Sequence, residues 1–173
     1  MKLTVTHRDA GLSEDRLYRY WLTREWIVPG QGEPSPDHRA PLWVCLNPST
    51  ADARSDDATV RSIMRLSTAW GYRRMILCNV FPWRATDPRE LAVAGERIRP
   101  FLNGAIIAEW RARADIVVAA WGESPYVTRE DEHRIHRLAG GVLACPGTNK
   151  SGSPKHPLYL PTSTPLCAWG PSR

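Results

Sequence analysis

The hydrophobic residues of the chain fall into short continuous runs, separated by longer stretches with helical periodicity or a polar composition. Continuous apolar runs of this length are typical of strands buried on both faces of a sheet. Apolar side chains spaced three and four residues apart indicate helices that cover such a sheet. The expected strands cover residues 42–46, 75–81, 115–122 and 141–145, and the expected helices cover residues 57–70, 101–113 and 126–138.

Strands that alternate with helices in this way predict an α/β fold, with a central, mostly parallel four-stranded sheet in a three-layer sandwich. Residues 16–28 mix aromatic, β-branched and charged side chains, so we expect them to add edge strands at the amino terminus. Residues 29–41 are expected to form a loop that borders a cleft, and Pro88 to open a short helix. The length of 173 residues suits a single domain over residues 1–173.

Ligands of parallel α/β sheets bind beyond the carboxyl ends of the strands. Asn47 and Pro48 end the first expected strand, and Asn79 lies within the end of the second. The amide of Asn79 can recognise the hydrogen-bonding edge of a base, although a structural turn is an equal alternative. For Asn47, an Asx turn followed by helix capping is the main alternative to a ligand contact.

Several further side chains near these strand ends are candidates for chemistry. Asp52, Asp56 and Asp57 crowd one loop, where a carboxylate pKa can rise or a divalent cation can bind, although solvated carboxylates are the simpler interpretation. Trp83 and Arg84 suit stacking and phosphate contact, or ordinary packing.

One histidine stands out from the other four in the chain. His156 follows Lys155 and precedes Pro157 at the end of a polar loop, so its backbone is restrained and its surroundings are basic. A simple exposed histidine is the alternative. His133 and His136 lie three residues apart on an expected helix, but no third ligand is near them in the sequence, so no metal site is predicted.

Composition narrows the possibilities only slightly. The net charge of +5 favours polyanionic partners but does not demand them. Cys45, Cys78, Cys145 and Cys167 form no C-x-x-C pair, and the first three lie in apolar runs, so we expect reduced core cysteines. No apolar run has the length of a membrane helix and the amino terminus lacks a secretory signal, so we expect a cytoplasmic protein.

Three segments resemble motifs of the uracil-DNA glycosylase superfamily. The segment 45–49, Cys-Leu-Asn-Pro-Ser, resembles the strand-ending G-I-N-P-G motif. The segment 79–84 resembles N-V-x-P-W-R, and His156-Pro157 resembles the H-P-S motif near the carboxyl end. Ala120-Trp121-Gly122 falls where the superfamily has a strand ending in A-L-G. Residues 46–52, 84–88 and 155–159 are also similar to a bacterial and phage family catalogued only as a domain of unknown function.

The resemblance implies a uracil-DNA-glycosylase-like fold and a monofunctional DNA glycosylase, which extrudes a base from the duplex and hydrolyses its N-glycosidic bond. In that interpretation Asn47 orients the water and His156 donates to the developing base anion. One of the three aspartates supplies negative charge. The implied substrate-binding residues are Asn79, Pro48, Ser49, Phe81 and Trp83. The implied DNA-binding residues are Arg84, Lys150, Lys155, Leu158 and Tyr159, with Leu158 or Tyr159 as a wedge in the vacated stack.

The identity of the base is the least determined part of this hypothesis. Ser49 replaces the second glycine of the motif, and no phenylalanine follows at the usual stacking position. Small side chains there predict a roomy pocket for a modified pyrimidine, such as a hypermodified phage base in an antiviral role. We expect DNA as the partner, no cofactor or metal, no membrane association and no obligatory protein partner, with the chain a monomer. The alternatives are a nucleotide or nucleoside hydrolase on the same scaffold and a non-catalytic nucleic-acid-binding module.

Overall fold

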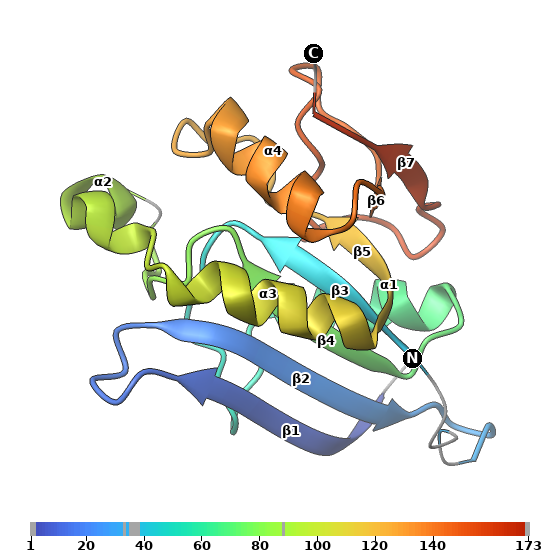
Figure 1. The fold of residues 1–173 in the computed structure, drawn as a ribbon. Coiled ribbons are helices and arrows are strands. Elements are labelled where there is room, and N and C mark those ends of the chain that lie inside the picture. The colour runs from blue at the N-terminus through green and yellow to red at the C-terminus, as the bar shows by residue number, and fades with distance from the viewer. Residues whose placement is uncertain (1–2, 33, 35–38, 88, 172–173) are drawn as a thin grey trace.

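The computed structural model describes residues 3–32, 34, 39–87 and 89–171, and shows one mixed sheet covered by helices (Figure 1). Pro88 and most of residues 33–38 lie outside the described residues. The elements in chain order are β1 (Thr4–Leu12), β2 (Arg19–Ile27), β3 (Ala40–Cys45), α1 (Ala58–Ala69), β4 (Arg74–Asn79), α2 (Glu90–Ala94), the 3₁₀ helix η1 (Gly95–Ile98), α3 (Leu102–Arg113), β5 (Ala114–Ala119), α4 (Arg129–Leu138), β6 (Leu143–Cys145) and β7 (Cys167–Trp169).

The sheet has seven strands in the order β1-β2-β4-β3-β5-β6-β7. Its four central strands, β4, β3, β5 and β6, run parallel to one another. The hairpin of β1 and β2 joins them antiparallel on one side, and β7 joins β6 antiparallel on the other. The predicted mixed α/β class is confirmed, but the expected sheet of four strands with an amino-terminal edge was too small.

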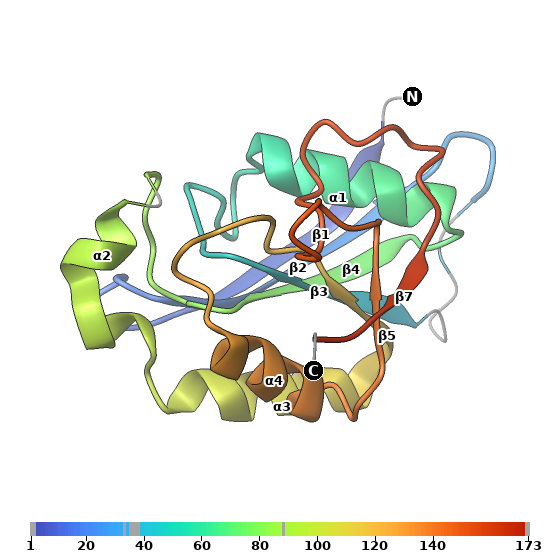
Figure 2. The same ribbon diagram turned by 90° about the horizontal axis from the view of Figure 1, so that it is seen from above.

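Helices cover both faces of the sheet (Figure 2). Helix α1 lies on one face, while α3 and α4 lie on the other. Alternate residues of β3 supply the two cores: Leu42 and Val44 pack towards α3 and α4, and Trp43 and Cys45 pack towards α1. This alternation follows from the two-residue period of a strand, and explains why the run is apolar throughout.

The start of helix α1 is fixed by local chemistry that also matters for the site. Asp57 is the residue before the first turn, and its carboxylate accepts a hydrogen bond from the backbone N–H of Val60 at 2.8 Å. The helix ends before Gly71, which has a φ of +90° that side chains rarely tolerate. The carboxylate of Asp57 is thereby held at the carboxyl edge of the parallel strands.

Candidate functional site

A cavity of about 430 Å³ opens at the carboxyl ends of β3, β4 and β5. Asn47 follows β3, Asn79 is the last residue of β4, and Gly122 lies just beyond the end of β5. His156 comes from the long loop between β6 and β7. All four residues line this cavity, so the fold brings together the three segments that the sequence singled out.

The amide of Asn47 is held with its nitrogen towards the protein. Nδ2 donates to the carbonyl oxygen of Ala85 at 2.8 Å and to that of Pro48 at 3.1 Å. The oxygen Oδ1 accepts no hydrogen bond from the described residues. Asn47 therefore presents an acceptor to the cavity, which is the group needed to orient a water molecule.

Asn79 is almost completely buried at 1% exposure. Its Oδ1 accepts a hydrogen bond from Nη2 of Arg19 at 3.0 Å, and its backbone oxygen accepts one from Nδ2 of Asn103 at 3.1 Å. Its own Nδ2 is buried and has no partner among the described residues. Asn79 is therefore a cavity-lining residue with a buried, unused donor.

His156 is oriented by its own loop. Its Nδ1 accepts a hydrogen bond from the backbone N–H of Leu158 at 3.2 Å, so the neutral ring carries its proton on Nε2. Burial lowers the pKa of His156 below its usual 6.5, and the charge of Asp57 partly opposes that effect. A neutral imidazole with an Nε2–H is suited to donate a hydrogen bond to a developing anion.

Gly122 permits the close approach of this loop to β5. Its φ is +76°, and a Cβ atom placed on it would lie 3.1 Å from Cβ of His156. Any other residue would thus be strained and would push the histidine loop outward. This is a physical reason for glycine at the end of the strand.

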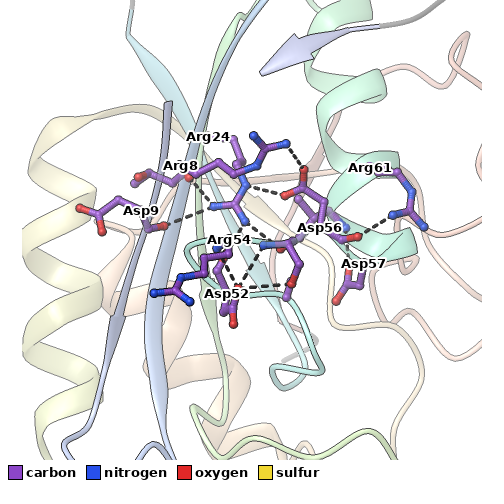
Figure 3. Close-up of polar contacts among 12 residues, drawn as sticks. Arg8, Asp9, Arg24, Asp52, Arg54, Asp56, Asp57 and Arg61 are labelled. Atoms are coloured by element: carbon purple, nitrogen blue, oxygen red, sulfur yellow. Dashed lines mark hydrogen bonds and ion pairs between the residues drawn. The ribbon is translucent and has the colours of Figure 1, made fainter. Parts of the chain in front are cut away.

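Of the three predicted aspartates, only Asp57 lines the cavity. Its charge acts on both Arg19 and His156, raising the pKa of each against the effect of burial. Asp52 and Asp56 lie outside the cavity and hold the loop before α1 in place (Figure 3). The cavity therefore has a single carboxylate from this cluster available for chemistry.

The contacts in Figure 3 tie that loop to the β1–β2 hairpin. Nε of the fully buried Arg24 lies 2.6 Å from Oδ1 of Asp56, and Nη2 of Arg8 lies 3.1 Å from Oδ2 of the same carboxylate. Arg24 also donates to the backbone oxygens of Asp52 and Ser55. Oδ1 of Asp52 accepts from the backbone N–H groups of Arg54 and Ser55, which closes a local turn.

Three predicted substrate-binding residues do not line the cavity. Phe81 is fully buried in the core, with the guanidinium of Arg99 4.9 Å from its ring centre. Trp83 packs edge-on against Tyr18, with ring centres 5.4 Å apart. Pro48 is buried, and its carbonyl oxygen accepts hydrogen bonds from the backbone N–H of Ala85 and from Nδ2 of Asn47. Ser49, by contrast, does line the cavity.

The predicted DNA-binding residues lie at different depths. Leu158 lines the cavity, and the next residue, Tyr159, is 89% exposed with a φ of +67°. Lys150 and Lys155 are exposed, and their side chains have no hydrogen bond or ion pair within the described part of the chain. Arg84 is partly buried, and its Nη1 donates to the backbone oxygen of Arg16 at 3.2 Å.

Arg19 is the main cavity residue that the sequence did not reveal. It begins β2, lies 60 residues from Asn79 in the chain, and is 2% exposed. Its position in the expected edge strand gave no sign of burial, because an arginine in such a strand is usually exposed. Trp121 also lines the cavity and supplies an aromatic wall that the motif comparison did not assign.

A second, larger hollow of about 890 Å³ lies between η1, α3 and α4. Its arginines, Arg99 and Arg134, both pair with Asp131, at 2.9 and 3.4 Å. Oδ1 of Asn103 is buried here without a partner among the described residues, but the charged groups of Arg99, Arg134 and Asp131 are paired, and none of the predicted site residues lines this hollow. The smaller cavity, with its unpaired polar atoms, is the better candidate for chemistry.

The described residues bear on metal binding and on membrane insertion. No group of three or more His, Cys, Asp or Glu side chains is placed to hold a metal ion within that part of the chain. None of its helices has the length and apolarity needed to span a bilayer.

Comparison with known proteins identifies the family of the chain but leaves its activity open. Searches of curated proteins and of solved structures produced no significant match. A family model described as "Protein of unknown function (DUF1643)" matches residues 19–158, a range that begins at Arg19 and includes Asn47, Asn79 and His156. Because this match spans most of the sequence, the chain belongs to the DUF1643 family.

Proposed function

We propose that this protein is a DNA glycosylase that hydrolyses the N-glycosidic bond of a flipped-out base and leaves an abasic site. The observation that carries the proposal is the meeting of Asn47, Asn79 and His156 in one cavity of about 430 Å³. That volume lies within the roughly 300–1,000 Å³ typical of small-molecule sites. Three distant segments thus supply an acceptor, a donor and a neutral imidazole around a space that a base can enter.

The chemistry assigned to these groups follows from their free atoms. A water molecule held by Oδ1 of Asn47 attacks the sugar carbon C1′, and the bond from C1′ to the base breaks with its electron pair left on the base. The proton that the water loses finally neutralises the released base. Nε2–H of His156 stabilises that negative charge. The carboxylate of Asp57 stabilises the oxocarbenium-like sugar or polarises the water.

The surroundings of the cavity support DNA as the substrate. Extruding a base costs a few kcal/mol, and a side chain that fills the vacated stack lowers that cost. We assign this role to Leu158, which lines the cavity, or to the exposed Tyr159 beside it. Lys150, Lys155 and Arg84 are the proposed phosphate contacts.

The proposal includes a uracil-DNA-glycosylase-like fold and a modified pyrimidine as the base. The parallel order β4-β3-β5-β6, with the cavity at the carboxyl ends, supports the first. Ser49, Ala85 and Thr86 line the cavity with small side chains, which supports room for a substituent on the ring. An antiviral role against phage DNA with hypermodified bases follows from that substrate.

The direct test is base excision from DNA. Duplexes containing uracil, mismatched thymine or hypermodified phage bases are incubated with the protein, and abasic sites are cleaved with alkali. We expect strand breaks with at least one of these substrates, and a rate at least about 100-fold lower for Asn47→Ala. Glu109→Gln, an exposed change on α3, serves as the control and should leave the rate unchanged.

Other outcomes of this experiment separate the alternatives. If the folded protein produces no strand breaks in any of the DNA substrates, the proposal is refuted. Release of free base from nucleosides without DNA would instead identify a nucleoside hydrolase. Binding of DNA that is unaffected by Asn47→Ala, without release of base, would identify a binding module.

A further inference from the structure

Two hydrogen-bond donors at the closed end of the cavity have no acceptor. Nε of Arg19 and Nδ2 of Asn79 are both buried and both lack a partner among the described residues. Arg19 and Asn79 line the cavity and are 2% and 1% exposed. A buried donor without an acceptor is costly, so two on neighbouring residues of one cavity indicate that a ligand supplies the missing acceptor.

The charge of Arg19 is also without a direct partner. Its Nη1 donates to the carbonyl oxygen of Ala51 and its Nη2 to the amide oxygen of Asn79, each at 3.0 Å. Both acceptors are neutral, and within the described chain no carboxylate lies within 4.0 Å of the guanidinium. Arg24, equally buried on the same strand, has Asp56 at 2.6 Å. Arg24 is thus one half of an ordinary buried ion pair, whereas Arg19 has no carboxylate beside it.

Arg19 stays charged despite this environment. Burial lowers its pKa to about 10, with Asp57 acting in the opposite direction, so the guanidinium is protonated at neutral pH. A buried cation without a directly paired carboxylate favours an anion or an electron-rich oxygen beside it. The closed end of the cavity therefore has a positive potential that an incoming group can neutralise.

The hydrogen bond between these residues also fixes what the floor of the cavity offers. Because Oδ1 of Asn79 accepts from Arg19, the amide is oriented with Nδ2 as its unused group. The floor then consists of donors: Nε of Arg19 and Nδ2 of Asn79. A carbonyl oxygen satisfies such a floor, whereas an exocyclic amino group would place donor against donor.

We propose that Arg19 is a specificity-determining residue, which forms with Asn79 a donor-only floor that binds a carbonyl oxygen of a base and rejects an exocyclic amino group. The inference rests on the proposed function in taking a nucleobase as the ligand. It adds a residue from the amino-terminal hairpin, outside the three motif segments. During excision the electron pair of the broken bond spreads onto the carbonyl oxygens of the base, where the positive charge of Arg19 stabilises it.

Binding of free bases tests this without any cleavage. Uracil and cytosine differ at one ring position by oxo against amino, and hypoxanthine and adenine form a second such pair. Affinities are measured by calorimetry or by ligand-observed NMR for the wild type, Arg19→Met, Arg19→Lys and the exposed control Arg113→Met. We expect the wild type and the control to favour the oxo base of each pair at least about tenfold, since a misplaced amino group leaves buried donors unpaired.

The variants separate specificity from simple support of the fold. Arg19→Met should reduce the preference to within about threefold, and Arg19→Lys, which keeps the charge but loses Nε, should give an intermediate preference. Binding of 5-fluorouracil, a more acidic imide, should strengthen with pH as it ionises in the wild type and should lose that dependence in Arg19→Met. If Arg19→Met does not fold, Arg19→Lys and the wild-type pH dependence decide the matter.

The results that would overturn this inference differ from those that concern excision. Equal affinity of the wild type for uracil and cytosine, no binding of any base, or an unchanged preference in folded Arg19→Met or Arg19→Lys would each refute it. An oxo preference that depends on Arg19, without excision from DNA, would support the floor and refute the glycosylase. Excision from DNA without an oxo preference would support the glycosylase and refute the donor-only floor.

Discussion

Nδ1 of His156 accepts a hydrogen bond from the backbone N–H of Leu158, so the loop that carries the histidine also selects its tautomer. The proton of the neutral ring must then lie on Nε2. Protonation of Nδ1 would place two donors against each other and would also put a charge into a partly buried site. Both effects favour the neutral ring in the folded protein.

The first prediction concerns the pH dependence of stability. The pKa of His156 is lowered by burial in the folded state, so the unfolded chain binds the proton first as the pH falls below 6.5. The contribution of His156 to stability is present above 6.5 and is lost on acidification. Urea unfolding at pH 7.5 and 5.5 should show a larger loss of stability for the wild type than for His156→Gln.

The same property predicts an acidic limit to activity. Excision should decline below pH 6.5 as the ring gains a proton and the hydrogen bond from Leu158 is broken. The ring C–H resonances of His156, assigned with His156→Gln, should titrate with a pKa below 6.5. A measured value above 6.5 would contradict the tautomer assignment.

The second prediction concerns the ion pair between Arg24 and Asp56. Asp56→Asn leaves a fully buried guanidinium without its counter-charge, which should lower the free energy of unfolding by about 3–5 kcal/mol. Chemical denaturation measures this change. The exposed pair of Arg113 and Glu109 is the comparison, because Glu109→Gln should have little effect. Equal effects of the two substitutions would show that burial does not strengthen the first pair.

The third prediction separates the backbone strain at Tyr159 from the proposed role of its side chain as a wedge. A tyrosine with a φ of +67° carries a backbone cost of about 1–3 kcal/mol, which glycine relieves at an entropic cost of about 0.5–1 kcal/mol. Tyr159→Gly should therefore keep or raise stability while lowering excision at least about tenfold, because the proposed wedge is gone. Phe101→Ala removes a more exposed aromatic ring away from the cavity and should leave excision unchanged. Normal excision by Tyr159→Gly would exclude the wedge.

The fourth prediction concerns the cysteines at the base of the histidine loop. Cys145 and Cys167 lie directly opposite each other on β6 and β7, and both are free thiols. Directly opposed residues of an antiparallel pair project from the same face. Glutathione disulfide should first react with the exposed Cys167, releasing one glutathione, and Cys145 should then displace the second. Burial raises the pKa of Cys145, so this second step should be faster in alkaline buffer.

The resulting bond would close the loop that contains His156. A loop of this length predicts a stabilisation of about 3 kcal/mol, or roughly 6–12 °C in Tm. Mass spectrometry should show the loss of two hydrogen atoms without retained glutathione. Cys167→Ser should show neither change, and a persistent mixed disulfide in the wild type would indicate that the thiols cannot meet.

The sequence predicted the central strands well because burial on both faces leaves an unmistakable signal. Strands β3, β4 and β5 each overlap an expected apolar run and begin one or two residues before it. Strand β1 is mostly exposed and polar, so its own residues give no strand signal. Its structure is decided by its pairing with β2. Strand β7 has three residues in a proline-rich tail, where a surface segment was the simpler prediction.

The site was predictable to the extent that it depends on strand ends. Asn47, Asn79 and His156 were placed together by the rule that parallel strands deliver their loops to one edge. The division among the aspartates was not predictable, because it depends on the buried Arg24, which attracts Asp56 and leaves Asp57 at the cavity. Arg19 could not be recognised, since nothing in its local pattern distinguishes a buried arginine from an exposed one.

The β1–β2 hairpin joins the edge of the sheet, yet two of its arginines reach the carboxyl ends of strands further in. Arg24 anchors the loop that presents Asp57, and Arg19 closes the cavity beneath Asn79. Transfer of only the four parallel strands and their loops to a new scaffold would remove Arg19 from the cavity and would leave the loop that carries Asp57 without its anchor. Any minimal version of this domain must therefore retain β1 and β2.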